Sequence, residues 1–372
     1  MSKIAFSPSE SGTGTLTIAA PNTNEDRTIT LPDANVQIAS PRGLFYKDTP
    51  DAVAWSKTGA FTVETATNLE VEVNRIVFLI PSGTAVTMPV SPVIGQDYTI
   101  WLNADGSLEA TTDHEAGPAI TSRKLGGFHY APNDNATLDA NGNWANHTGA
   151  PTTAVPQINA LSFWDLKWKP GGRDPRGLSL CPIAQVWAGM YPMNNGNVAG
   201  KPIHSYGVAP CRDGNPPFKR WADTPVAYPD AKPINILELL RSEGLRPMTA
   251  DLFQILALGT TEQVSAGGSN PGNTGEQGTA QNKNRFVSAW GLFDITGVIS
   301  AWGADSLPDN TQAAGVTQGR SNDIFRVSRF ANFGGNWNST ATSGSRFVNA
   351  DEASGSRSGI GGRGVTNHIV IP

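Results

Sequence analysis

Glycine and proline punctuate this chain so often that only short helices and strands can form between them. The 372 residues include 40 glycines and 27 prolines, and asparagine and threonine are abundant in the intervening segments. Glycine, proline and asparagine form turns, and short alternating apolar and polar runs between turns are typical of β-strands. We therefore expect a mainly β protein with long loops, and the length indicates two or three domains.

Charge and hydropathy argue against several classes of partner. The formal net charge is -5 and the sequence pI is about 5.6, without a basic stripe, so nucleic acid is not an expected partner. No apolar run approaches the roughly 20 residues that span a bilayer, so we expect no membrane insertion. The first residues lack the apolar segment of a secretory signal. We expect a protein made in the cytosol, which leaves the cell, if at all, by lysis or as part of a particle.

Side chains of catalytic or metal-binding type are scarce. Cys181 and Cys211 could form one disulfide, but two buried free thiols are favoured. The five histidines stand at no metal-ligand spacing with cysteine or carboxylates, so no metal or cofactor is expected. The pair Asp351 and Glu352 would point to opposite faces of a strand, which argues against a paired acid and base. We therefore expect no enzyme activity.

Residues 1–42 contain few large apolar side chains. Two short alternating runs, at 15–18 and 28–31, flank a turn cluster at 21–24. An isolated hairpin is marginally stable in water, so these strands need equivalent strands from other chains around an axis. The segment therefore predicts oligomerisation, and a flexible tail is the alternative.

Residues 43–159 predict a β domain that ends in a loop and linker from about residue 131. Leu69, Val71 and Val73 alternate with polar residues, and a second strand at 76–80 follows a turn at 74–75. Another strand, with Tyr98, Ile100 and Leu102, leads into a hairpin turn at 105–106, and Leu108 resumes the pairing.

Residues 160–372 predict strands combined with two helices. We expect a first strand from Leu161 to Trp168. A helix at 234–242 should end before Gly244, and a second helix should begin after the cap Thr249 and end at Gly259.

The rest of this segment predicts short strands and long loops. A loop rich in glycine, asparagine and serine is expected at 265–284, followed by short strands that carry Trp290–Gly291 and Trp302–Gly303. Beyond residue 326 a few large apolar residues stand among glycine, serine and asparagine. We expect Phe333 and Trp337 to fill the core there.

Two motifs resemble a known fold. The stretch LRPMTADLF at 245–253 resembles the helix entry of the C-type lectin branch that includes the formylglycine-generating enzymes. GGNW at 334–337, paired with GIGGRGV at 359–365, resembles the closing strands of that branch. Those enzymes need cysteines late in the fold, and no cysteine follows Cys211 here, so the shared fold does not carry their chemistry over.

A larger set of motifs, in the same order across residues 43–372, resembles the major tropism determinants of temperate phages. These motifs are RKLGGFHYAP at 123–132, DPRG at 174–177, LGTTE at 258–262, FGGNWN at 333–338, SGSR at 343–346 and RGVTNH at 363–368. The first 42 residues instead resemble a generic tail-fibre segment through GTGTLTIAAPNTN at 12–24.

This resemblance implies a fold, a function and partners. The fold would be a homotrimer with an N-terminal β-prism at 1–42, a central β-sandwich at 43–159 and a C-terminal α+β C-type lectin-like domain at 160–372. The function would be that of a tail-fibre receptor-binding protein in the virion. Its partners would be a bacterial cell-surface receptor, either protein or saccharide, and phage tail or baseplate proteins.

In that family a diversity-generating retroelement varies receptor-binding positions around a fixed Gly-Gly-x-Trp frame. Carried over to this chain, those positions are Asn336, Asn338, Ser339, Thr340, Thr342, Asn349 and Asp351, followed by Glu352, Ser356, Arg357 and Ile360. Between Arg346 and Gly361 the chain is one residue shorter than the family pattern. The last four positions can therefore be assigned in two ways that differ by one residue.

The chemistry of these positions departs from the family, whose binding face is often aromatic. Asparagine, serine, threonine, aspartate and arginine predominate here, which suggests a polar ligand such as a saccharide. A tailspike-like glycan-cleaving enzyme and a purely structural tail-tip or baseplate protein are the alternatives. A structural tip would not need a long polar loop set between fixed glycines, so adhesion is favoured.

Overall fold

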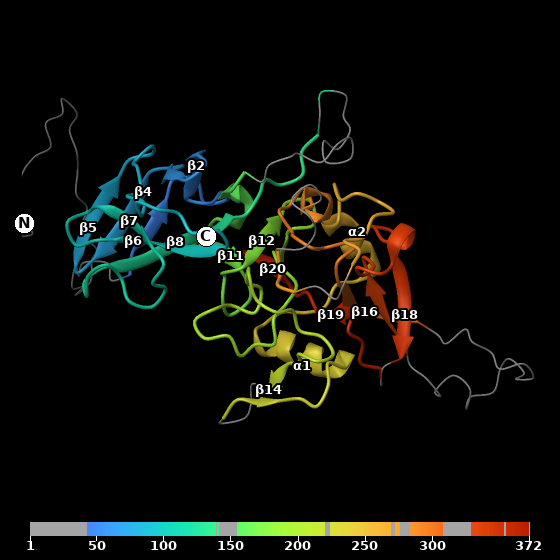
Figure 1. Ribbon diagram of the computed structural model, residues 1–372. Helices are drawn as coiled ribbons and strands as arrows, with labels where there is room; N and C mark the ends of the chain where they lie inside the picture. Colours follow the sequence, from blue (N-terminus) through green and yellow to red (C-terminus); the bar gives the residue numbers. More distant parts are fainter. Residues whose placement is uncertain are drawn as a thin grey trace, which may run out of the picture. The chain divides into compact units, whose positions relative to one another are not determined.

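The structure is a computed structural model that describes residues 43–138, 140, 155–219, 224–268, 272–275, 283–307, 329–352 and 355–371. The expected strands at 15–18 and 28–31, and with them the β-prism, lie outside these residues. Strands dominate the described chain and helices are short, so the mainly β fold class is confirmed (Figure 1). Neither α-helix in the described ranges is long and apolar enough to cross a membrane.

The first region is built from short antiparallel strands. They are β1 (Phe45–Lys47), β2 (Trp55–Gly59), β3 (Thr62–Thr65), β4 (Leu69–Val73), β5 (Ile76–Ile80), β6 (Gln96–Leu102), β7 (Leu108–Thr111), β8 (Arg123–Ala131), β9 (Gln157–Ile158) and β10 (Trp164–Asp165). One sheet has the order β1-β4-β5, β2 pairs with β3, and a five-stranded sheet has the order β10-β8-β6-β7 with β9 on β8. Buried apolar side chains from β1 to β9 share one core.

The hairpin of β4 and β5 follows directly from its residues. Leu69, Val71 and Val73 are at most 2% exposed, and the glutamates between them face outward or lie half-buried. Asn74 and Arg75 both have positive φ, at 49° and 68°, which is the backbone of a tight two-residue hairpin turn. The expected strands and turn are confirmed, as are β6, β7 and the turn at Gly106, whose φ is 87°.

The expected single strand from Leu161 to Trp168 is wrong. The chain instead forms a short 3₁₀ helix η2 (Ala160–Ser162), then β10, then β11 (Trp168–Pro170). The buried Asp165 causes the break, because its Oδ1 accepts the backbone N–H groups of Lys167 and Trp168 at 2.7 and 2.8 Å and closes a turn. The strand β10 pairs with β8 in the first region, and β11 pairs with β20 in the next.

The second region combines short sheets with two α-helices. Its further elements are β12 (Leu178–Cys181), β13 (Val186–Gly189), β14 (Phe218–Lys219), β15 (Val226–Ala227), α1 (Pro233–Ser242), α2 (Ala250–Leu256), η3 (Lys283–Phe286), β16 (Ser300–Leu307), β17 (Arg329–Phe333), η4 (Thr340–Thr342), β18 (Val348–Glu352), β19 (Ile360–Gly361) and β20 (Val365–Val370). Two four-stranded sheets have the orders β11-β20-β13-β12 and β18-β17-β16-β19, and β14 pairs with β15.

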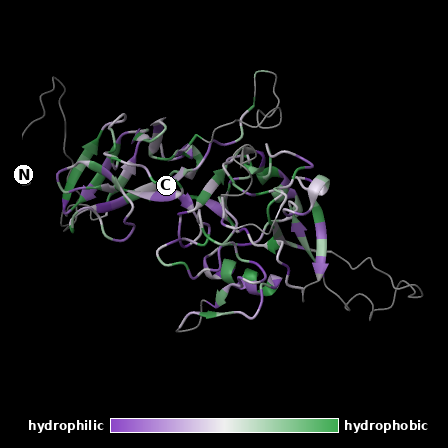
Figure 2. Cartoon of the chain, viewed as in Figure 1, coloured by the Kyte–Doolittle hydropathy of each residue, from purple (hydrophilic) through white to green (hydrophobic). Residues whose placement is uncertain are grey.

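Helix α1 lies within one residue of its predicted range, and α2 begins as predicted but ends at Leu256, before the expected stop at Gly259. Helix α1 buries Ile236, Leu239 and Leu240 on one side and is followed by Gly244 with a φ of 71°. Figure 2 shows hydrophobic stretches along α1, whereas much of the loop chain is hydrophilic. Helix α2 begins after Thr249, whose hydroxyl accepts the N–H of Leu252 at 3.4 Å.

The expectation for the two cysteines is confirmed, and the expectation for Trp290 and Gly291 is wrong. Cys181 and Cys211 are buried free thiols, as the sequence favoured. Trp290 and Gly291 do not lie on a strand; they form a turn in which the Gly291 N–H donates to Ser288 O at 3.0 Å and the Trp290 indole donates to Ile255 O at 2.7 Å.

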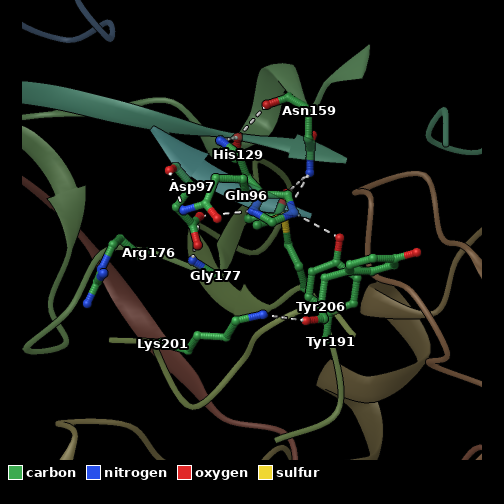
Figure 3. Close-up of polar contacts among 12 residues, drawn as sticks. Gln96, Asp97, His129, Asn159, Arg176, Gly177, Tyr191, Lys201 and Tyr206 are labelled. Atoms are coloured by element: carbon green, nitrogen blue, oxygen red, sulfur yellow. Dashed lines mark hydrogen bonds and ion pairs between the residues drawn. The ribbon is translucent and has the colours of Figure 1, made fainter. Parts of the chain in front are cut away.

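A buried polar network lies where β6 and β8 meet the second region (Figure 3). His129 Nδ1 is 2.9 Å from Asp97 Oδ1, and His129 Nε2 is 2.8 Å from the Tyr191 hydroxyl. Burial opposes ionisation of Asp97, but the charge and hydrogen bond of His129 and the N–H of Gly177 together lower its pKa. Burial raises the pKa of Tyr191 well above its usual value. The trio links the two regions through these hydrogen bonds. Tyr191 is 0% exposed, so its hydroxyl is out of reach of a substrate.

A second buried polar group holds the start of β20. His204 Nδ1 donates to Tyr191 O at 2.8 Å, and its Nε2 accepts the N–H of Gly364 at 3.1 Å. Burial, together with the nearby guanidinium of Arg363, lowers the pKa of His204 to about 3. Arg363 is itself 2% exposed and donates to the carbonyl oxygens of Gly189 and Phe293. The closing segment is therefore fixed by buried hydrogen bonds.

Candidate functional site

The sheet β18-β17-β16-β19 presents one polar face. Asn349 of β18 is paired with Asn332 of β17, and Ser300 of β16 is paired with Ile360 of β19. Directly paired residues point to the same side of a sheet, as do residues two apart on one strand, so Asp351 shares the face of Asn349. A cavity of about 380 Å³ opens on this face, and all five of these residues line it.

The opposite face of the sheet is apolar and anchors it. Ala301, Ala331 and Phe333 lie in the buried core of the second region. The ring of Phe333 is 0% exposed and stacks on Phe253 of α2 with ring centroids 5.2 Å apart. The alternation along β17 therefore puts Ala331 and Phe333 in one core, and Asn332 faces the cavity on the other side, where Trp302 of β16 belongs to a second buried core.

Two glycines start the loop that forms one rim of the cavity. Gly334 and Gly335 have φ values of 90° and 74°, and a Cβ on Gly335 would lie 2.7 Å from Ser343 Oγ. Only glycine takes this backbone and this approach without strain. In the loop that follows, Asn336 Oδ1 accepts the N–H of Asn338 at 2.9 Å, and Ser339 Oγ accepts the N–H of Asn336 at 2.9 Å. The rim is thus held by its own short hydrogen bonds.

Trp337 lies on this rim. The expectation that it fills the core is wrong, because the side chain is only partly buried and lines the cavity. Its backbone is fixed by a hydrogen bond from its N–H to Val298 O at 3.0 Å, which leaves the indole at the edge of the polar face.

The other rim comes from the segment before β19. Arg357 forms a two-point ion pair with Asp351, with Nε–Oδ2 at 3.0 Å and a second contact, Nη2–Oδ1, at 3.2 Å. The side chain of Arg357 is 57% exposed and that of Asp351 is 17% exposed. Ser358 and Gly359 continue this rim, and Phe347 adds a second aromatic ring to the lining. The two opposite charges in the lining are therefore matched to each other.

The structure brings most of the expected receptor-binding positions together. Those that line the cavity are Asn336, Asn338, Ser339, Asn349, Asp351, Arg357 and Ile360. Ile360 contributes little surface, since it is 5% exposed and packs in the core beneath α1.

The remaining expected positions lie outside the lining. Thr340 and Thr342 are exposed on η4, where the hydroxyl of Thr342 donates to Ser339 O at 2.6 Å. Ser356 Oγ accepts the N–H of Ala231 and donates to Asp213, so it fastens the rim to the loop before α1. Glu352 belongs to β18, paired with Arg329, and its side chain lies outside the described part.

Several lining residues were not anticipated from the sequence: Ser300, Asn332, Trp337, Phe347, Ser358 and Gly359. Asn332 carried a usable signal, because it is a single amide between Ala331 and Phe333 in a strand that is apolar at all other positions after Arg329. A polar residue at alternating spacing on a core strand marks the face that is not packed. Ser300 carried no such signal.

The arrangement suits binding of a polar molecule. Amides and hydroxyls make up most of the lining, and within the described lining Asp351 is the single carboxylate. Among the residues that the structure describes, no group of three or more histidine, cysteine, aspartate or glutamate side chains is placed to hold a metal ion.

Comparison with known proteins identifies the relatives of this chain. The family described as "Mtd second domain" matches residues 53–165. A tail fiber receptor-binding protein of Bordetella phage BPP-1 is 35% identical over 340 residues, which cover 88% of this chain and 85% of the relative. Among solved structures, the Major Tropism Determinant M1 variant has a TM-score of 0.76 at 32% identity and covers 89% of this chain and 87% of its own. The U1 variant has a TM-score of 0.75 at 34% identity, with 88% and 86% coverage. The chain therefore belongs to the major tropism determinant family.

Proposed function

We propose that this chain is the receptor-binding protein of a phage tail fibre and that its polar cavity contacts the receptor on the bacterial surface. The relative at 35% identity is a tail fiber receptor-binding protein. The observation that supports the site is the cavity on the sheet β18-β17-β16-β19, which is lined by seven of the eleven expected variable positions, whereas Ala331 and Phe333 are buried on the opposite face.

This separation suits an adhesive surface. Asn338 is exposed and Asn349 is exposed, so changing them disturbs few core contacts. Surface substitutions away from special features usually change stability by less than about 0.5 kcal/mol. The cavity side chains can therefore vary to fit a receptor while Phe333 and the two rim glycines keep the fold.

The lining favours binding over catalysis. Glycoside hydrolysis uses two carboxyl groups that flank the scissile bond, and the described lining offers Asp351 alone, held by Arg357. The buried trio of Asp97, His129 and Tyr191 has the order of a catalytic relay, but its hydroxyl is inaccessible. An adhesin without enzyme activity is the function that fits both sites.

The proposal includes assembly and place in the virion. We expect a homotrimer joined to phage tail or baseplate proteins through residues 1–42, and a retroelement that varies the cavity positions. Three linked copies would turn a weak contact of each cavity into firm attachment through high effective concentration. Sedimentation equilibrium tests the trimer, and a folded monomer at micromolar concentration would refute it.

The test of function is adsorption of the purified full chain to host cells. Labelled protein should bind the cells and block adsorption of the phage. Asn338→Ala and Asn349→Ala should weaken binding without lowering the melting temperature. Asn197→Ala is the matched control, since Asn197 is an exposed asparagine outside the cavity.

Each alternative function has its own outcome in this assay. Release of oligosaccharides from the cells or from their purified polysaccharide would show a glycan-cleaving enzyme. Absence of both cell binding and phage blocking would favour a structural tail-tip role. Binding that survives all cavity substitutions would place the receptor surface elsewhere on the chain.

A further inference from the structure

One buried amide of the cavity lining has a donor without a hydrogen-bond partner. Asn332 is 1% exposed, lies in the middle of β17 and lines the cavity, and its Nδ2 has no hydrogen-bond partner. Buried polar groups are nearly always paired, because an unpaired donor loses its hydrogen bonds to water without replacement. An acceptor oxygen supplied by a ligand would satisfy this donor. Asn332 is also part of the sheet, so its position is fixed before any ligand arrives.

Other amides of the lining are held in set orientations. Asn336 Oδ1 accepts the N–H of Asn338, and Asn349 Oδ1 accepts the N–H of Ala350, each at 2.9 Å. With the oxygen of each group used locally, the amide nitrogen is the end that can serve a ligand. Ser300 and Ser358 add hydroxyls, which both donate and accept. The cavity therefore suits a ligand with many oxygens that act as acceptors and donors.

The charges in the lining favour a neutral ligand. Asp351 and Arg357 bind each other at two points, at 3.0 and 3.2 Å. The pair has no net charge, so an anionic ligand would meet Arg357 only beside the repulsion of Asp351, and a cationic ligand would meet Asp351 only beside the repulsion of Arg357. A neutral molecule can hydrogen-bond to the pair without separating it.

The aromatic residues supply the apolar part of the site. Trp337 and Phe347 are partly exposed and line the same cavity as the amides. Its volume of about 380 Å³ falls within the range of roughly 300–1,000 Å³ that is usual for small-molecule sites. A ring with an apolar C–H face and hydroxyls around its edge meets both requirements at once.

We infer that the cavity binds a neutral saccharide, with a pyranose ring against Trp337 and a sugar oxygen that accepts from Asn332 Nδ2. This inference rests on the proposed receptor-binding function and names the chemistry of the receptor. A protein receptor, which would spread its contacts over a wider surface, is the outcome that the test must separate from it.

The experiment uses the purified full chain and defined sugars. Saturation-transfer NMR is recorded with glucose, galactose, mannose, N-acetylglucosamine and their disaccharides, and with glucuronic acid as the anionic comparison. We expect saturable binding of at least one neutral sugar. Asn332→Leu should weaken it by about tenfold, the effect of losing one good hydrogen bond, without lowering the melting temperature. Trp337→Ala should abolish binding, Trp337→Phe should retain part of it, and Asn197→Ala should leave it unchanged.

Adsorption to host cells gives the second readout. Periodate, which cleaves sugar diols, should remove the cell binding, and the bound neutral sugar should compete with it. If protease removes cell binding while periodate and sugars leave it intact, the receptor-binding function stands and the saccharide inference is overturned. Absence of cell binding overturns the proposed function, and the NMR series still decides the ligand class. Absence of any neutral-sugar binding, tighter binding of glucuronic acid, or an unaffected Asn332→Leu variant overturns the saccharide inference.

Discussion

Replacing Phe333 by alanine should destabilise the protein far more than replacing Trp337. Phe333 is 0% exposed, stacks on Phe253, and leaves so little room that a Cβ on Gly303 would lie 2.3 Å from its ring. Such tight surroundings cannot collapse into the space that alanine leaves. We expect Phe333→Ala to lower the free energy of unfolding by about 3–5 kcal/mol, including the lost aromatic stacking.

Trp337→Ala should have the opposite profile. The indole is partly exposed on the cavity rim, and the hydrogen bond from its N–H to Val298 O is made by the backbone, which alanine keeps. We expect a loss of about 1 kcal/mol, about half the value for burying a large apolar side chain fully. Binding to host cells should nevertheless fall sharply, because the variant loses the largest aromatic side chain of the lining.

The two variants are compared by urea unfolding, followed by fluorescence and circular dichroism, beside binding to host cells below the midpoint of unfolding. Phe333→Leu serves as the control that keeps the site apolar and should recover much of the stability. Equal destabilisation by Phe333→Ala and Trp337→Ala, with cell binding of the tryptophan variant intact, would refute the placement of Trp337 on a binding surface.

Three further predictions concern buried or constrained groups that hold the fold. Above about pH 6.5 His204 is neutral both folded and unfolded, but its folded pKa of about 3 means that at pH 5 only the unfolded chain takes up the proton. The free energy of unfolding should therefore fall by about 2 kcal/mol between pH 7.5 and pH 5, and His204→Gln should remove that part of the slope in urea titrations. Gly335→Ala combines a φ of 74° with a contact of 2.7 Å, so it should cost at least about 2 kcal/mol, and an unchanged melting temperature would contradict the argument. Lys47→Met leaves the buried carboxylate of Asp165 without its cation at 2.9 Å, so it should cost about 3–5 kcal/mol in the same melts, whereas a milder loss would show that the backbone N–H donors suffice.

Local features of the fold could be predicted because short-range chemistry decides them. The β4–β5 hairpin required alternating apolar residues and a turn of two residues with positive φ, and Asn74 opens that turn. Helix α2 required a capping hydroxyl at Thr249, whereas it ends at Leu256, before the expected stop at Gly259. Each signal lies within a few residues of the structure that it specifies.

Features set by distant contacts could not be predicted in the same way. Trp337 looked like a core residue because it is large and apolar in a polar segment, yet its backbone pairing with Val298 places it on the rim. The strand expected from Leu161 was interrupted because Asp165 is buried against Lys47, more than a hundred residues away. The motif resemblance supplied the site positions, whereas the pairing of strands across the sheet added Asn332 and Ser300.

Side chains alternate between the two faces of β17, and this explains how one short sheet can serve both stability and recognition. Phe333 and Ala331 face α2, and Asn332 between them faces the cavity, so a single strand belongs to the core and to the site at once. Hydrophobic burial on one face holds the polar face rigid, which lowers the entropy lost when a ligand binds. The rim loop is fixed by backbone geometry at Gly334 and Gly335 and by the local hydrogen bonds of Asn336 and Ser339, so exposed side chains such as Asn338 carry little of the folding free energy. The sheet therefore keeps one shape while the side chains that line its cavity can be substituted.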